Sequence, residues 1–265
     1  MDTKKEKSAV ILCFLLLVAL VAVIILGNIK NNKENKNIVV KSEDKKVSLQ
    51  KEDKKVNEKE KKDLYIKLKN KEDISICIIG DSIANSEGVI KQENNWNEKL
   101  KKYIENTYNS KVTIEHIINN GGLSERLDLY NKNKKQYDLI LLCSGYNDRN
   151  AKIEEFGPKY ENFLNNIIER NDKTEIFLVV ENSLRKFDKV PNEIKKIKEY
   201  YELNLIDLRE AFADSPKPYK QLTKDNINPN DDGYDLYSTA IFDKIKLNNK
   251  ENKKIDYKVK DKLYK

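Results

Sequence analysis

The residues best suited to chemistry lie where predicted strands end. Ser82 follows the β-branched run Ile74–Gly80 in a Gly-Asp-Ser turn, and Asn147 follows a second apolar run in the sequence Gly-Tyr-Asn-Asp. Asp225 and Asn228 lie in a polar loop before the last apolar periodic segment. A hydroxyl, a carboxamide and a carboxylate are most of what a serine acyl-transfer site needs, namely a nucleophile, an oxyanion donor and an orienting acid.

One of these motifs alone would be ambiguous, because a serine that follows a strand also caps helices. A further turn, Asn119–Ser124, adds weight because it follows another predicted strand and contains Gly121 and Gly122. Its backbone N–H groups are expected to face the same edge of the sheet as Ser82. The sequence therefore predicts one composite site, built from several strand ends.

Strands and helices alternate through the second part of the chain. Apolar runs predict strands at 74–80, 112–118, 137–143, 175–180 and 203–207, and 3.6-residue periodicity predicts helices at 96–108, 156–168, 191–201 and 233–247. This order indicates an α/β fold, a flavodoxin-like three-layer α/β/α arrangement around a parallel five-stranded sheet. In such sheets ligands bind at the carboxyl ends of the strands, where the polar turns lie.

The constellation resembles the SGNH (GDSL-like) hydrolase superfamily of esterases, lipases and carbohydrate deacetylases, over roughly residues 74–247. Four short blocks carry the resemblance in the family's order: Gly80-Asp81-Ser82, Asn120–Ser124, Gly145–Asp148 and Asp225–Tyr234. The resemblance implies that Ser82 is the nucleophile, that Asp225 is the acid, and that Ser82, Gly122 and Asn147 donate to the oxyanion. The family's oxyanion glycine stands late in the second block, near Glu125 here. No metal or other cofactor is expected.

The last block departs from the family pattern at one position. The family has its catalytic histidine where this chain has Asn228, although the following Pro229-Asn230 match. A carboxamide does not accept a proton near neutral pH, so Asn228 cannot be the general base. His116 is the single histidine, and at ~3.3 Å per residue it lies about 7 Å before the end of its strand. We interpret it as a packed strand histidine.

The N-terminal part of the chain has a different composition. Residues 9–27 contain no charge, and a helix of that length spans about 28 Å, close to the ~30 Å hydrocarbon core of a membrane. A cleavable signal peptide is the competing interpretation, but no small-x-small cleavage site follows the run. Lysines on both sides of the segment nearly balance the positive-inside count. The short tail of residues 1–8 favours an anchor with the long C-terminal part outside the cell.

These observations predict five segments: a short tail at 1–8, a transmembrane signal anchor at 9–27, a charged disordered tether at 28–73, the α/β domain at 74–247 and a Lys-rich tail at 248–265. The tether contains 15 Lys and 10 Asp/Glu with no Gly or Pro, so it cannot bury enough apolar surface to offset the entropy of ordering. The predicted location is the cell membrane, with a single pass and an extracellular domain.

Composition also excludes several classes. The net charge of +7 arises from 51 basic and 44 acidic residues that are interleaved, which is typical of a solvated surface rather than a nucleic-acid interface. One His and three unpaired Cys argue against a metal centre or a disulfide scaffold. Richness in Lys, Asn and Ile suggests a bacterial source.

Three functional hypotheses remain. The first is a membrane-anchored esterase or deacetylase that acts on acyl or acetyl esters of a cell-surface glycan through Ser82. The second is a catalytically impaired pseudoenzyme that binds a glycan or protein partner, which Asn228 favours. The third is an O-acyltransferase component that receives acyl groups from a membrane partner.

Overall fold

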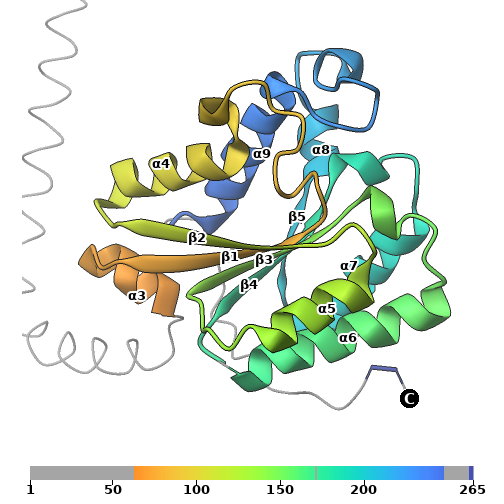
Figure 1. Ribbon diagram of the computed structural model, residues 1–265, viewed down its shortest axis with the longest axis horizontal. Coiled ribbons are helices and arrows are strands. Elements are labelled where there is room, and N and C mark those ends of the chain that lie inside the picture. Colours follow the sequence, from red (N-terminus) through yellow and green to blue (C-terminus); the bar gives the residue numbers. More distant parts are fainter. Residues whose placement is uncertain (1–62, 171, 248–262, 265) are drawn as a thin grey trace, which may run out of the picture. The chain divides into compact units, whose positions relative to one another are not determined.

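A five-stranded parallel sheet forms the centre of the domain (Figure 1). The computed structural model describes residues 63–170, 172–247 and 263–264. The strand order is β2-β1-β3-β4-β5. The strands are β1 (Ile74–Gly80), β2 (Val112–Ile118), β3 (Leu139–Ser144), β4 (Glu175–Val180) and β5 (Asn204–Asp207).

Helices connect the strands. The α-helices are α3 (Asp63–Asn70), α4 (Trp96–Tyr108), α5 (Leu123–Lys132), α6 (Ile153–Arg170), α7 (Lys189–Tyr201), α8 (Leu208–Ala213) and α9 (Asp231–Ile245). Four 3₁₀ turns lie in the loops: η1 (Gln92–Asn94), η2 (Tyr146–Asp148), η3 (Asn182–Leu184) and η4 (Tyr219–Gln221).

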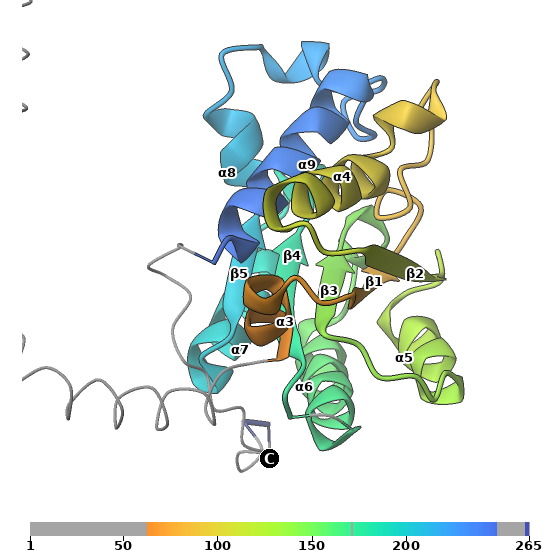
Figure 2. The same cartoon turned by 90° about the vertical axis from the view of Figure 1, so that its left-hand side faces the viewer.

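The helices cover both faces of the sheet (Figure 2). Helices α5, α6 and α7 contribute to one buried apolar cluster, while α3, α4, α8 and α9 contribute to the other. Successive residues of β1 alternate between the clusters, with Cys77 and Ile79 in the first and Ile76 and Ile78 in the second. Both faces are therefore buried, as continuous apolar strands require. The predicted three-layer α/β/α fold with a parallel five-stranded sheet is confirmed.

The strand order positions the site. From β1 the chain crosses to β2 on one side of it and later to β3 on the other. The carboxyl ends of β1 and β3 therefore flank the point where the winding direction changes, which is where doubly wound sheets bind ligands. Ser82 follows β1 and Asn147 follows β3, so the topology alone places both at this crevice.

Helix α3 corrects the predicted boundary of the tether. It lies at Asp63–Asn70, within the segment that we predicted to be disordered up to residue 73. Leu64 and Leu68, one turn apart, are 0% and 2% exposed and belong to the apolar cluster with α4 and α9. The prediction failed because two leucines in a lysine-rich stretch are a weak signal until the surface that buries them is known.

The predicted transmembrane anchor at 9–27 lies outside the described residues. Within the part of the chain that the structure describes, no helix is both long and apolar enough to cross a membrane.

Candidate active site

Ser82 occupies the first turn after β1 and is partly exposed. Its backbone N–H donates to Oδ1 of Asn120, at 2.9 Å, and this contact ties the first predicted block to the second. Asp81, only 1% exposed, accepts the N–H of Ile83 at 3.0 Å and so closes the turn around the serine. The N–H that the resemblance assigns to the oxyanion is therefore already hydrogen bonded in this structure.

Asn147 lies in turn η2, directly after β3. Its Nδ2 donates to Oδ2 of Asp81, at 3.1 Å. One carboxylate thus holds both the Ser82 turn and the Asn147 carboxamide, and the structure brings these two predicted residues together. The carboxamide has two N–H bonds, and one of them is used by Asp81.

Four charged side chains are buried next to this turn, each at most 3% exposed: Asp81, Arg126, Asp148 and Glu181. Nη2 of Arg126 donates to both carboxylate oxygens of Asp148, at 2.5 and 2.6 Å. A Cβ on Gly145 would lie 1.9 Å from Oε2 of Glu181 and 3.0 Å from Oδ2 of Asp81. Gly145 is therefore required, because only the absence of a side chain lets these carboxylates approach the loop that carries Asn147.

Three carboxyl groups in this cluster face one guanidinium. Burial raises the pKa of Glu181 well above its ordinary value, and the nearby Asp81 raises it further. Burial likewise raises the pKa of Asp81, although Arg126 opposes that effect. The raised pKa favours the neutral form of Glu181, and a neutral carboxyl avoids the cost of a second uncompensated buried charge.

Asp225 and Asn228 form a closed pair in the loop before α9. Asn228 donates twice to Asp225, from its backbone N–H to Oδ1 and from its side-chain Nδ2 to Oδ2, both at 2.7 Å. Burial by itself would raise the pKa of Asp225, but the hydrogen bonds from the Asn228 backbone and side chain lower it. The carboxamide thus makes the hydrogen bond to the acid that an imidazole N–H would make at this position, without a proton-accepting nitrogen.

Asn182, at the end of β4, holds this loop against the sheet. Its Nδ2 donates to the carbonyl of Ile227, at 3.1 Å, and to the hydroxyl of Tyr219, at 2.8 Å, while the hydroxyl of Tyr237 in α9 donates to its Oδ1. The 0% exposure of Asn182 fits this full set of partners. The hydroxyl of Tyr234 joins α9 to the segment after Ser82 by donating to the carbonyl of Glu87, at 2.8 Å.

Two cavities open at this edge of the domain. The first, of about 310 Å³, includes Gly122 and Asn147 in its wall, so two predicted oxyanion residues share one space. Glu125 lines the same cavity, in the first turn of α5, and its carboxylate lies against Gly121 and Gly122. A carboxylate therefore stands beside the two glycines of this turn, and it opposes the binding of an oxyanion there.

The second cavity, of about 620 Å³, lies along η3, α8 and η4. Tyr219 and Phe212 supply aromatic surface, with ring centroids 5.5 Å apart, and the guanidinium of Arg185 lies 3.8 Å from the Tyr219 ring centroid. Through Asn182, Tyr219 is linked to the loop of Asn228, so this cavity adjoins the predicted site.

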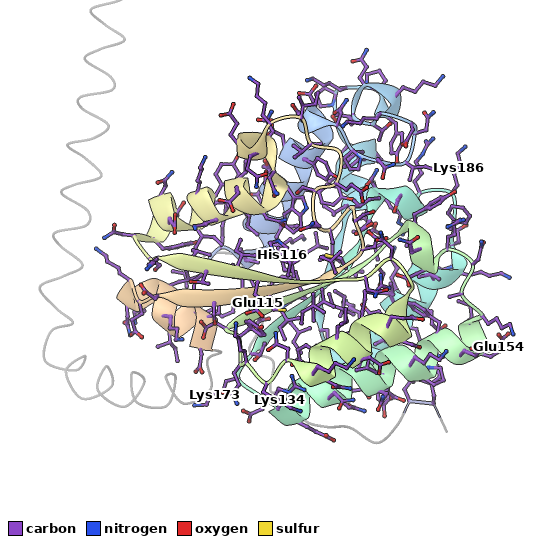
Figure 3. All side chains as sticks on the ribbon, viewed as in Figure 1. Glu115, His116, Lys134, Glu154, Lys173 and Lys186 are labelled. Atoms are coloured by element: carbon purple, nitrogen blue, oxygen red, sulfur yellow. The ribbon has the colours of Figure 1, made fainter. Side chains whose placement is uncertain are left out.

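His116 lies on β2, next to Glu115 (Figure 3). It pairs in register with Ile78, four residues before Ser82, on the edge strand β2. Its side chain is exposed, so the interpretation of a packed strand histidine is wrong about the packing. An edge strand leaves one side of such a residue open to solvent. Its position in mid-strand agrees with the expectation that it is not at the carboxyl edge.

The sequence profile of the GDSL-like lipase/acylhydrolase family matches residues 78–236, a span that includes all four blocks. The chain belongs to this family. The match with this GDSL-like family covers the segment that holds Ser82, Asn147 and Asn228. No curated protein sequence matches the chain.

Solved structures agree on the fold of this GDSL-like domain. A two-domain esterase active on acetylated mannans matches with a TM-score of 0.59 and 18% identity, over 71% of this chain and 53% of the other. A lipase from a goat rumen metagenome matches with a TM-score of 0.51 and 18% identity, over 66% and 99%. A lipase/acylhydrolase from Enterococcus faecalis gives 0.51 and 16%, over 64% and 93%. The chain thus spans about half the length of the two-domain esterase.

Sequence reasoning missed Arg126, Glu181 and Asn182. Glu181 and Asn182 directly follow β4, and this position at a strand end, which they share with Ser82 and Asn147, was their signal in the sequence. Arg126 lies on the same face of α5 as the buried Leu123 and Tyr130, so an arginine on an apolar stripe was its signal.

Proposed function

We propose that this GDSL-like domain is a membrane-anchored esterase or deacetylase that removes acyl or acetyl groups from esters on cell-envelope glycans, with Ser82 as the nucleophile. The observation that carries the proposal is the Ser82 turn, held at the switch point of the sheet by Asp81, which also holds Asn147. The cavity lined by Tyr219, Phe212 and Arg185 offers aromatic surface and hydrogen-bond donors of the kind that a glycan needs.

In this mechanism the Ser82 Oγ attacks the ester carbonyl carbon. The negative charge that develops on the carbonyl oxygen is stabilised by the second N–H of Asn147 and by the N–H of Gly122. The N–H of Ser82 joins them only if the Asn120 side chain turns away, since Asn120 accepts it at present. Solvent water takes up the proton that the Ser82 hydroxyl releases and returns it to the leaving oxygen, so that the alcohol departs and leaves an acyl-serine. Water then hydrolyses the acyl-serine to the acid and free Ser82.

The proton of Ser82 has no ordinary acceptor in this arrangement. Asn228 is a carboxamide, and Asp225 is occupied by two hydrogen bonds from Asn228. Enzymes of this class that lose one member of the triad retain a residual rate from oxyanion stabilisation and substrate binding, several orders of magnitude below the full rate. We therefore expect slow turnover.

A second candidate function is binding without turnover. Two observations favour it: the carboxamide at position 228 and the Glu125 carboxylate beside Gly121 and Gly122. In that case the same edge of the sheet would hold a glycan or a protein partner. An O-acyltransferase component that works with a membrane partner is a third possibility, and it would require that partner for acyl transfer to a glycan.

Labelling with a fluorophosphonate separates the first two functions, because the reaction requires an activated serine. We expect slow labelling of the purified protein at Ser82, which reaches one equivalent only over hours and is located by mass spectrometry, and no labelling of Ser82→Ala. Ser86→Ala, a buried serine four residues further along, is the matched control. No adduct after hours on a folded protein would contradict the esterase proposal and leave the binding function.

A further inference from the structure

Leu263 and Tyr264 lie against α6 and α7. In the sequence they come well after Leu247, where the described part of the chain that contains α9 ends. The N–H of Leu263 donates to Oε1 of Glu161 at 2.5 Å, and the N–H of Tyr264 donates to Oε2 at 3.3 Å. One carboxylate thus accepts two consecutive backbone N–H groups. This contact is unrelated to the Ser82 site and is not explained by the proposed function.

Glu161 is suited to this role because it is only 3% exposed. A buried carboxylate is costly unless hydrogen bonds satisfy its oxygens. The hydroxyl of Tyr201 in α7 donates to Oε1, at 2.7 Å. Among the residues that the structure describes, this carboxylate also accepts the N–H groups of Leu263 and Tyr264. The two residues therefore complete the hydrogen bonding of a side chain that α6 alone leaves short of donors.

The side chain of Tyr264 fits its surroundings closely. A Cβ on Gly157 would lie 2.5 Å from Cζ of the ring, so the ring can occupy its present place only beside a glycine and would have to shift beside any other residue. The Tyr264 hydroxyl donates to Glu193 of α7, and Nζ of Lys196 lies 4.5 Å from the ring centroid, a cation–π distance. Leu263 and Tyr264 also pack on the apolar cluster of this face.

We propose that the surface of α6 and α7 around Glu161, Gly157 and Glu193, which we call the Leu-Tyr site, binds a Leu-Tyr pair of a peptide, and that this chain fills it in cis with its own residues 263–264. In this site Glu161 accepts the two backbone N–H groups of the pair, Gly157 leaves room for the tyrosine ring, and Glu193 accepts the tyrosine hydroxyl. We call this contact the latch: it holds residues 263–264, which follow α9 in the sequence, on the face of the sheet opposite to α9. A tethered segment has an effective concentration near the millimolar range, so it excludes a free peptide of the same sequence.

Hydrogen exchange of the full-length protein tests the latch directly. We expect the amides of Leu263 and Tyr264 to exchange at least ~10-fold more slowly than in an unfolded chain. Glu161→Gln should abolish the protection of Tyr264, because an amide NH₂ would face its N–H. Glu154→Gln, an exposed glutamate on the same helix (Figure 3), should leave it unchanged. Unprotected amides in the folded wild-type protein would overturn the proposal.

Peptide binding tests the site. A labelled peptide with the sequence of residues 256–265 should bind the full-length Tyr264→Ala variant, in which the ring that fills the space over Gly157 is missing, and bind the wild-type protein at least ~10-fold more weakly. Gly157→Ala in the same variant should remove this binding. If Tyr264→Ala does not fold, the double variant Leu263→Gly/Tyr264→Gly replaces it. The proposal is contradicted if the folded variant does not bind the peptide. It is also contradicted in cis if light scattering shows that the wild-type protein is a dimer through exchange of this segment.

Discussion

Asn228 is the residue whose chemistry limits the proposed reaction. Its Nδ2 donates to Asp225 at 2.7 Å, which is the bond that an imidazole N–H would make there. We therefore expect Asn228→His to raise the hydrolysis of a small acetyl ester by at least ~10²-fold, the usual contribution of a positioned general base. The rate of p-nitrophenyl acetate hydrolysis measures this.

Two control variants test whether the gain depends on Ser82 and on the position of the imidazole. Ser82→Ala in the Asn228→His background should remove the gain. Asn226→His places the same imidazole two residues away, at an exposed position with φ of 64°, which histidine tolerates, and should give no gain. An unchanged rate in a folded Asn228→His protein would mean that the fourth block has been assigned wrongly or that another base already serves.

Glu181 makes a second prediction at the scale of single residues. Its pKa is raised in the native state, whereas in the unfolded chain it releases its proton near pH ~4.3. The native state therefore binds more protons above that pH, and the stability that Glu181 contributes is lost as the pH rises through its native pKa. Glu181→Gln should stabilise the protein more at pH 8 than at pH 5.

Thermal unfolding at both pH values measures this difference. Glu154→Gln, at an exposed site on α6, should show no such pH-dependent difference. An equal effect of Glu181→Gln at both pH values would show that Glu181 is ionised in the native state.

At the scale of elements, α3 extends the domain beyond the GDSL-like blocks. Leu64 is fully buried in the cluster formed with α4 and α9, so Leu64→Ala leaves a cavity there. We expect a loss of about 2–5 kcal/mol in the free energy of unfolding, measured by urea denaturation. Lys69→Ala, exposed on the same helix, should cost less than ~0.5 kcal/mol. Equal effects would mean that α3 does not pack on the sheet in solution.

At the scale of the whole molecule, the anchor predicted at residues 9–27 decides where the reaction takes place. If that segment spans the bilayer with the domain outside, protease added to intact protoplasts should release a fragment that begins between residues 28 and 62, before α3. The fragment's N-terminus can be read by mass spectrometry. Full-length protein that survives this treatment but is cut after lysis would place the domain inside the cell.

The sequence by itself determined the parallel α/β fold and the set of polar turns at its edge. A strand that is buried on both faces requires a continuous apolar run, and the chain must turn where that run stops. The pattern of apolar runs and polar turns therefore indicated Ser82, Asn147 and Asp225 as candidate site residues. That Asn228 cannot serve as a general base also follows from the sequence, because proton affinity belongs to the residue type.

The tertiary structure alone decided which side chains meet across elements. Asp81, Arg126, Asp148 and Glu181 come from four separate segments, and their contact depends on how α5 packs against the sheet. The acceptance of the Ser82 N–H by Asn120, the burial of α3 and the seating of Tyr264 over Gly157 have the same origin. Periodicity reports that a residue is buried, but its partner is fixed only by the packing of elements that are distant in the chain.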